Sequence, residues 1–100
     1  LKFSHRDDIW LHVHNMPGSH VIIQKSNKDI PEGTLEDAAL LAAYYSKGRN
    51  GENIPVDYTA RKNVRKLRGA KLGMVRYDNY KTIIITPSKK LIKRIKKVEN

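Results

Sequence analysis

Alternating apolar and polar positions near the start of the chain predict a β-hairpin. From Ile9 to His14 apolar side chains alternate with aromatic and imidazole side chains, and a second apolar run follows at Val21–Ile23. This alternation is typical of a half-buried strand. Pro17 and Gly18 stand between the runs and suit a type II turn, because proline fixes a negative φ and glycine accepts a positive one. We therefore predict two antiparallel strands within residues 8–24.

A polar loop over residues 25–33 precedes a segment that we predict to be helical. Thr34 suits the N-cap, and the carboxylates of Glu36 and Asp37 would meet the positive end of the helix dipole. Gly48 is placed to end the helix. The apolar residues at helical spacing are Leu35, Ala38, Ala39, Ala42 and Tyr45. Because small side chains allow close approach, we expect the Ala-rich face to lie across a sheet.

The rest of the chain is predicted to be mainly extended. Short strands are expected within residues 56–66. A second hairpin, formed by residues 74–77 and 80–86, is expected around Asp78-Asn79, since both residues tolerate the positive φ of a type I′ turn. Ser88 can then cap a last helix. This order indicates an α+β fold: a mostly antiparallel sheet with one Ala-rich helix packed across it and a C-terminal basic amphipathic helix.

The composition fits one small globular domain. The chain has 100 residues, of which 39% are hydrophobic, and it has no cysteine, so it can bury one core without disulfides. No apolar run approaches the roughly 20 residues of a membrane-spanning helix, and no signal peptide is recognisable, so we expect a cytoplasmic protein with no membrane partner. Because the sequence begins at Leu1, we expect residues 1–100 to be a single domain from a longer, multidomain protein.

Positive charge is concentrated in the second half of the chain. The net charge is +10; residues 1–50 contribute nothing to it, because six basic residues balance six acidic ones, whereas residues 51–100 hold 14 basic and four acidic residues. This asymmetry favours a polyanionic partner, nucleic acid before membrane. A basic surface that serves only solubility is the alternative. The cations that we expect to contact phosphates are Arg61, Lys62, Arg65, Lys66, Arg68 and Lys71.

Aromatic and imidazole side chains form a second candidate site. Side chains two apart on a strand share a face, so His12 and His14 project beside Trp10, and the turn can bring His20 near them. The amides around Gly18 and Ser19 leave room for close backbone approach. Stacking of Trp10 on a base, with contacts from the imidazoles, would make this face an RNA platform. In the alternative reading, the helix covers this face and Trp10 belongs to the core.

Zinc binding and catalysis are further alternatives for these histidines, since neutral imidazoles at this spacing can share a zinc ion. The spacing supplies no further ligands, and no oxyanion hole or orienting group accompanies Ser19 and His20. We therefore predict that the protein is not an enzyme and has no catalytic residue, no metal and no other cofactor.

Several ordered runs carry a resemblance to a known family. They are Asp7–Val13, Pro17–Ile23, Leu35–Ser46, Val56–Thr59, Val64–Lys66, Gly69–Lys71, Gly73–Val75 and Lys81-Thr82. In their order and spacing they resemble the NFACT-R (NFACT RNA-binding) domain of the family that includes RqcH, NEMF and fibronectin-binding protein A-like proteins. The residues that the resemblance carries over are Asp8, Trp10, His12, Pro17, Gly18, Ser19, His20, Lys66, Gly69 and Lys71.

The resemblance implies an RNA-binding module of ribosome-associated quality control. Proteins of this family bind large ribosomal subunits that carry a stalled nascent chain, help recruit tRNA and, in bacteria, support addition of a C-terminal alanine tail. The implied partners are therefore tRNA and the large subunit with its ribosomal RNA. The alternative function is a fibronectin-binding surface adhesin, with fibronectin as the partner.

Overall fold

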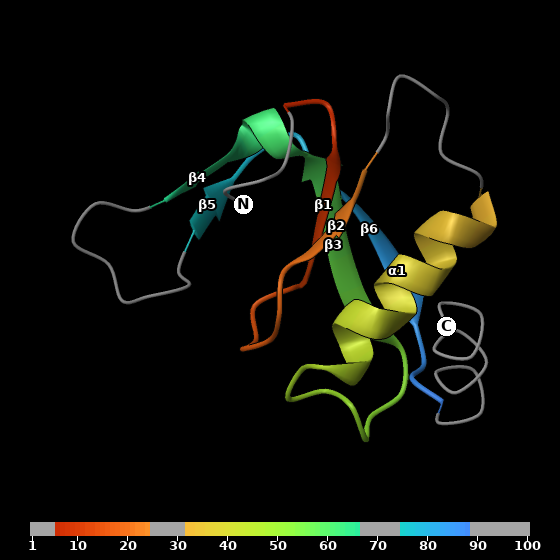
Figure 1. Cartoon of the computed structure of the whole chain (residues 1–100). Helices are drawn as coiled ribbons and strands as arrows, with labels where there is room; N and C mark the ends of the chain where they lie inside the picture. The colour runs from red at the N-terminus through yellow and green to blue at the C-terminus, as the bar shows by residue number, and fades with distance from the viewer. Residues whose placement is uncertain (1–5, 25–31, 67–74, 89–100) are drawn as a thin grey trace.

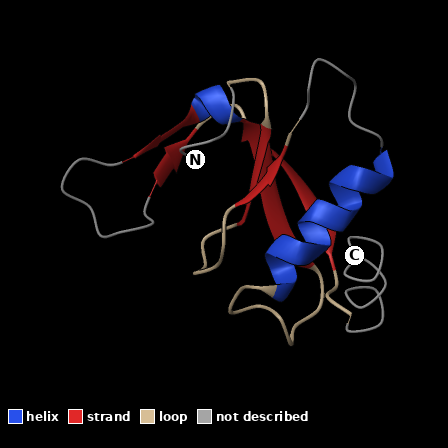
Figure 2. Ribbon diagram, viewed as in Figure 1, coloured by secondary structure: helices blue, strands red, loops and turns tan. Residues whose placement is uncertain are grey.

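The computed structural model describes residues 6–24, 32–66 and 75–88, which form a four-stranded antiparallel sheet with a helix across it and a two-stranded sheet (Figure 1, Figure 2). The elements in chain order are β1 (Ile9–Val13), β2 (Val21–Ile23), α1 (Glu32–Tyr44), β3 (Ile54–Ala60), the 3₁₀ turn η1 (Arg61–Asn63), β4 (Val64–Lys66), β5 (Val75–Tyr77) and β6 (Lys81–Ile85). The large sheet has the order β2-β1-β3-β6, and the small sheet pairs β4 with β5. The predicted α+β class is confirmed.

The core lies between α1 and one face of the large sheet. Because side chains alternate along a strand, Leu11 and Val13 of β1 share this face with Ile54 and Val56 of β3. All four are buried. The helix contributes a stripe of small side chains to the same core: Ala38, Ala39, Ala42 and Ala43. These alanines let the helix lie close to the strands, which confirms the expected position of the helix across the sheet.

The predicted N-terminal hairpin is confirmed, but its turn differs. β1 and β2 pair antiparallel. The positive φ falls on Asn15 (51°) and not on Gly18, so the predicted type II turn at Pro17-Gly18 is wrong. Gly18 instead forms a β-bridge with Ser46, and a Cβ at position 18 would lie 3.0 Å from the side chains of Ser46 and Val13. The close approach at this bridge therefore leaves little room for a side chain at position 18.

Helix α1 begins and ends earlier than predicted. Thr34 lies inside the helix and is not its N-cap. The last helical residue is Tyr44, and Ser46 closes the turn that follows: its hydroxyl donates to the Ala43 carbonyl at 2.6 Å and accepts from the Gly48 N–H at 3.0 Å. Gly48 therefore belongs to the turn after the helix.

The second predicted hairpin is wrong in its pairing. β5 pairs with β4, whereas β6 pairs with β3, so the chain passes through Asp78 and Asn79 from one sheet to the other. A type I′ turn needs a positive φ at both central residues, and of these two only Asn79 has one (51°). The Thr59 hydroxyl donates to the Asp78 carbonyl at 3.0 Å, so contacts distant in sequence determine the path of the chain here.

The strands expected within residues 56–66 are confirmed as β3 and β4. The expected C-terminal amphipathic helix falls in residues 89–100, outside the described residues. Helix α1 has 13 residues, and none of the helices in the described ranges has the length and apolar character needed to span a membrane.

Candidate nucleic-acid interface

The sheet face opposite α1 carries a cluster of aromatic and imidazole rings. Trp10 stacks on His12, with ring centroids 5.8 Å apart and planes 4° apart. Its Nε1–H donates a 2.8 Å hydrogen bond to Nδ1 of His20. Tyr77, from β5, contacts the Trp10 ring at a centroid distance of 4.6 Å. Trp10, His12, His20 and Tyr77 are called the Trp10 cluster below. The turn thus brings His20 to Trp10 and His12, as the sequence predicts.

Trp10 is 0% exposed, although it lies on the face away from the helix. The burial of Trp10 expected in the alternative reading is therefore confirmed, but the small sheet and the neighbouring imidazoles cover the ring, and α1 does not. A ring with no exposed surface cannot stack on a base, and the stacking role expected for Trp10 does not fit this structure. His12 and His20 are partly exposed. They form the accessible edge of the cluster, and Trp10 supports them.

Both ring nitrogens of His12 lie near carbonyl oxygens. Nδ1 is 2.7 Å from the Val13 carbonyl and Nε2 is 3.3 Å from the Gly18 carbonyl. Because a carbonyl oxygen only accepts, both hydrogen bonds form together only in the imidazolium, which has a proton on each nitrogen. These two contacts fix the orientation of the His12 ring beside Trp10.

A buried carboxylate connects the two sheets. Asp57 of β3 is 0% exposed and accepts hydrogen bonds from Nδ1 of His14 (2.6 Å), the Tyr77 hydroxyl (2.6 Å) and the Thr82 hydroxyl (2.7 Å). Since an ionised carboxylate only accepts, Nδ1 of His14 carries the hydrogen. Burial and the hydrogen bond to Asp57 raise the pKa of Tyr77, which keeps this phenol protonated and donating. His14 thus orients on Asp57 and shares its Oδ2 atom with Tyr77 of the Trp10 cluster.

The small sheet presents two arginines to solvent. Its register places Val64 opposite Tyr77 and Arg65 opposite Arg76. Val64 is buried and Tyr77 contacts Trp10, so by alternation the two arginines project from the other face, and both are exposed. Like charges directly opposed on a strand pair repel each other. An anion placed between the two guanidinium groups would replace this repulsion with attraction.

Two further exposed cations lie next to the small sheet, Lys62 of η1 and Arg6. Lys62 is exposed, and its backbone N–H donates to the carbonyl of the exposed Arg6 at 3.0 Å. Arg61 differs: its Nη1 donates to the Val64 carbonyl at 3.2 Å, and its Nε is buried, with no hydrogen-bond partner in the described part of the chain. Arg61 is therefore turned toward the protein. Below, the cationic edge is the set of Arg6, Lys62, Arg65 and Arg76.

The remaining predicted site residues are placed as follows. Lys66 is the last residue of β4, and Arg68 and Lys71 lie outside the described residues. Ser19 is exposed in the segment before β2. Arg6 and Arg76 are absent from the predicted set. Arg76 stands between Val75 and Tyr77. The alternation of apolar and charged side chains at this point could have predicted that Arg76 is exposed on a strand.

The described histidines belong to no metal site. Across residues 6–24, 32–66 and 75–88, no three His, Cys, Asp or Glu side chains are arranged to hold a metal ion. The rings of His12 and His20 have centroids 5.3 Å apart. The Nδ1 atom of His14 is engaged by Asp57.

Fold and surface together define a small α+β domain with exposed cations on the outer face of its small sheet and an imidazole-rich cluster on the large sheet. The chain belongs to the family of NFACT protein RNA binding domains, which it matches over residues 1–79. The resemblance found in the sequence is thereby confirmed.

Relatives share nearly the whole chain. The Rqc2 homolog RqcH of Bacillus subtilis is 47% identical over 92 residues, which are 92% of this chain and 16% of that protein. Coiled-coil domain-containing protein 25 of Mus musculus is 31% identical over 105 residues, covering 99% of this chain and 50% of that protein. The chain therefore spans at most half the length of these relatives.

A solved structure has the same fold. It is the C-terminal part of the fibronectin/fibrinogen-binding protein from Streptococcus suis, which matches with a TM-score of 0.86 and 39% identity. The match covers 93% of this chain and 37% of that one.

Proposed function

We propose that this domain binds RNA through the cationic edge and is a non-catalytic module. The observation that carries the proposal is the exposed Arg65–Arg76 pair, in a member of an RNA-binding domain family. Side chains directly opposed on an antiparallel pair have Cβ atoms roughly 5 Å apart. Each of two guanidinium groups at that spacing can bind a phosphate of the RNA backbone with charge-assisted, bidentate hydrogen bonds.

The Trp10 cluster supplies the second part of the proposed interface. Tyr77 belongs to this cluster and follows Arg76 in β5, and the two side chains point to opposite faces of that strand. The partly exposed rings of His12 and His20 can donate to phosphate or contact a base. RNA held by the arginine pair would reach the imidazoles by passing around the edge of the small sheet.

The proposed partners are tRNA and the ribosomal RNA of the large subunit. Support comes from the identity to the RqcH proteins of Bacillus subtilis (47%) and Streptococcus suis (39%) over most of this chain. In this role the protein acts in the cytoplasm, on large subunits that carry stalled chains, and supports C-terminal tailing. Co-sedimentation with purified large subunits tests it: the chain should pellet with them at low salt, and Arg65→Gln with Arg76→Gln should release it.

The salt dependence of RNA affinity tests the interface itself. Each phosphate contact that is lost should flatten the slope of log affinity against log salt by about 0.7 to 0.9. Arg65→Gln and Arg76→Gln should each do so. Thr34→Glu is the matched control, because it lowers the net charge equally but sits on the exposed side of α1. Equal slopes for the arginine variants and the control would refute the proposed interface.

The name of the Streptococcus suis protein favours a second candidate function, fibronectin binding through the same basic surface. A pull-down with fibronectin separates the two functions. Saturable capture that survives nuclease treatment supports fibronectin binding, whereas capture that nuclease abolishes is mediated by RNA.

A further inference from the structure

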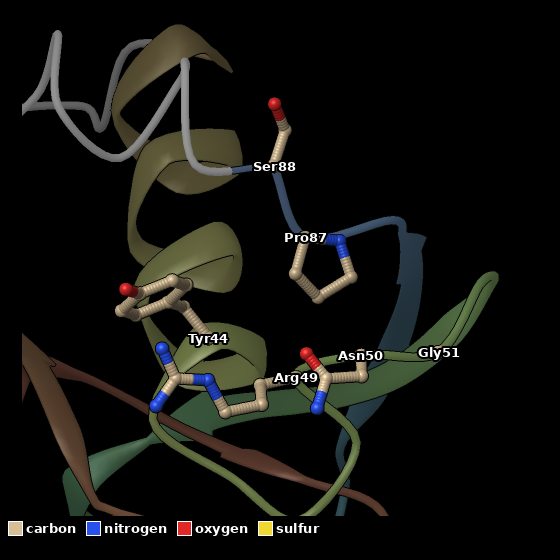
Figure 3. Close-up of a pocket in the computed structure, with 6 residues that line it drawn as sticks. All are labelled: Tyr44, Arg49, Asn50, Gly51, Pro87 and Ser88. Carbon is tan, nitrogen blue, oxygen red and sulfur yellow. The ribbon is translucent and has the colours of Figure 1, made fainter.

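A small cavity lies at the opposite end of β3 from the cationic edge. Its volume is about 210 Å³, and it opens between the end of α1, the loop that follows and the end of β6 (Figure 3). Its lining residues are Tyr44, Arg49, Asn50, Gly51, Pro87 and Ser88. None of these residues belongs to the interface described above.

The loop that forms the cavity is held in place by backbone hydrogen bonds. The Arg49 N–H donates to the Ser46 carbonyl at 3.3 Å, and the Gly51 N–H donates to the Gly48 carbonyl at 2.9 Å. The Asn53 N–H donates to the Thr86 hydroxyl at 3.0 Å, which ties the loop to the end of β6. These contacts form the cavity before any ligand binds.

One wall of the cavity is a stacked pair of planar groups. The Arg49 guanidinium carbon lies 4.4 Å from the centroid of the Tyr44 ring, and Figure 3 shows this guanidinium directly below that ring. Pro87 adds an apolar surface above Asn50. The amide of Asn50 and the hydroxyl of Ser88 add hydrogen-bond donors and acceptors, and no carboxylate is among the lining residues.

This chemistry fits a planar, uncharged heterocycle with polar edges. The volume is below the roughly 300 to 1,000 Å³ of sites for drug-sized ligands, so one ring system fits and a peptide segment does not. Proteins bind unpaired RNA bases by stacking them on aromatic rings or guanidinium planes and by hydrogen bonding to their edges. We propose that the cavity receives one unpaired base of the bound RNA, an inference that rests on the RNA binding proposed above.

The position of the cavity fits a strand of RNA that crosses the domain. β3 has seven residues, so its two ends lie about 23 Å apart. η1 and β4 follow one end, and the loop with Arg49 precedes the other. Phosphates on the cationic edge and a base in the cavity would therefore be several nucleotides apart on one RNA, and only single-stranded RNA could occupy the cavity.

Substitutions at Arg49 and Asn50 remove the base contacts. Both residues are exposed, so the fold should stay intact. Arg49→Lys keeps the charge and loses the planar group, and Asn50→Ala loses the amide. Lys47→Arg is the matched control, since Lys47 is exposed in the same loop but does not line the cavity. The probes are a single-stranded oligonucleotide and a duplex RNA, and melting temperatures check folding.

Arg49→Lys should weaken single-strand binding by about 10-fold, the scale of one lost base stack. Asn50→Ala should also weaken it, through the lost hydrogen bonds, and both variants should leave duplex affinity and salt slope unchanged. Asn50→Asp, which exchanges a donor for an acceptor, should alter the ranking of homopolymeric A, C, G and U probes. Unchanged single-strand affinity in Arg49→Lys and Asn50→Ala would overturn the base site while RNA binding stands. If the unmodified chain binds no RNA, the proposed function and the base site both fail.

Discussion

Tyr77 and Asp57 join the two sheets: the phenol of Tyr77, from the small sheet, donates a 2.6 Å hydrogen bond to the buried carboxylate of Asp57, in the centre of the large sheet. The same tyrosine covers Trp10. Since Arg76 precedes Tyr77 in the chain and points to the other face of β5, this contact sets the position of the cationic edge relative to the imidazoles. The buried acid therefore supports the interface without touching RNA.

Removing the Tyr77 hydroxyl should destabilise the protein. Tyr77→Phe leaves Asp57 with one donor fewer in a buried site, which costs about 1 to 3 kcal/mol. Urea unfolding measures the loss. Tyr80→Phe is the control, because Tyr80 is 42% exposed, and it should change the free energy of unfolding by less than about 0.5 kcal/mol. Equal effects of the two variants would show that the hydrogen bond to Asp57 does not hold the sheets together.

Alkaline solution should weaken the fold through the same phenol. The pKa of Tyr77 is raised above its ordinary value of 10.0 by burial and by Asp57, so the folded state favours the protonated phenol. Its contribution is complete below pH 10.0 and is lost as the pH rises above that value. The stability of the wild type should therefore fall more steeply above pH 10 than that of Tyr77→Phe. Parallel curves for the two proteins would contradict this assignment.

Two glycines should respond oppositely to alanine. At Gly18 a Cβ would lie 3.0 Å from the side chains of Ser46 and Val13, so Gly18→Ala should destabilise by about 1 to 3 kcal/mol through overpacking. At Gly33, near the start of α1, a Cβ meets no atom within 4 Å. Gly33→Ala should therefore stabilise by up to about 1 kcal/mol. Thermal unfolding of both variants checks the prediction, and a harmless Gly18→Ala would exclude the tight bridge to Ser46.

Trp10 is the one tryptophan of the chain, so its fluorescence reports its environment directly. Because the ring is buried under Tyr77, acrylamide should quench it weakly in the folded protein and strongly after unfolding in urea. Addition of RNA should leave the quenching by acrylamide nearly unchanged. Strong quenching by RNA itself would instead mean that a base reaches the Trp10 ring.

The hairpin of β1 and β2 and the Ala-rich helix could be predicted because their signals are local. The alternation from Ile9 to His14 predicts one strand and its buried face, and the alanines of α1 predict one helix and its buried face. The same local reasoning failed at Asp78-Asn79, where a turn sequence suggested that the flanking strands pair with each other. Each of these strands found a more distant partner, and the Thr59 hydroxyl holds the turn between them.

The candidate site was only partly predictable. The density of cations directed attention to Lys62 and Arg65, which are exposed. Arg76 is isolated in the sequence and becomes significant only through its register with Arg65. In the sequence, Asp57 looks like an ordinary polar position of a strand. Its burial depends on hydrogen-bond donors from three separate segments, which carry His14, Tyr77 and Thr82.

A map of backbone amide shifts on titration with tRNA tests the RNA interface most directly, because it reports the contact surface without presuming it. The largest shift changes should fall on Lys62, Arg65 and Arg76, with smaller changes at His12 and His20. The exposed side of α1, around Thr34, should stay unperturbed. Shift changes on that side of the helix, with an unperturbed cationic edge, would contradict the proposed mode of RNA binding.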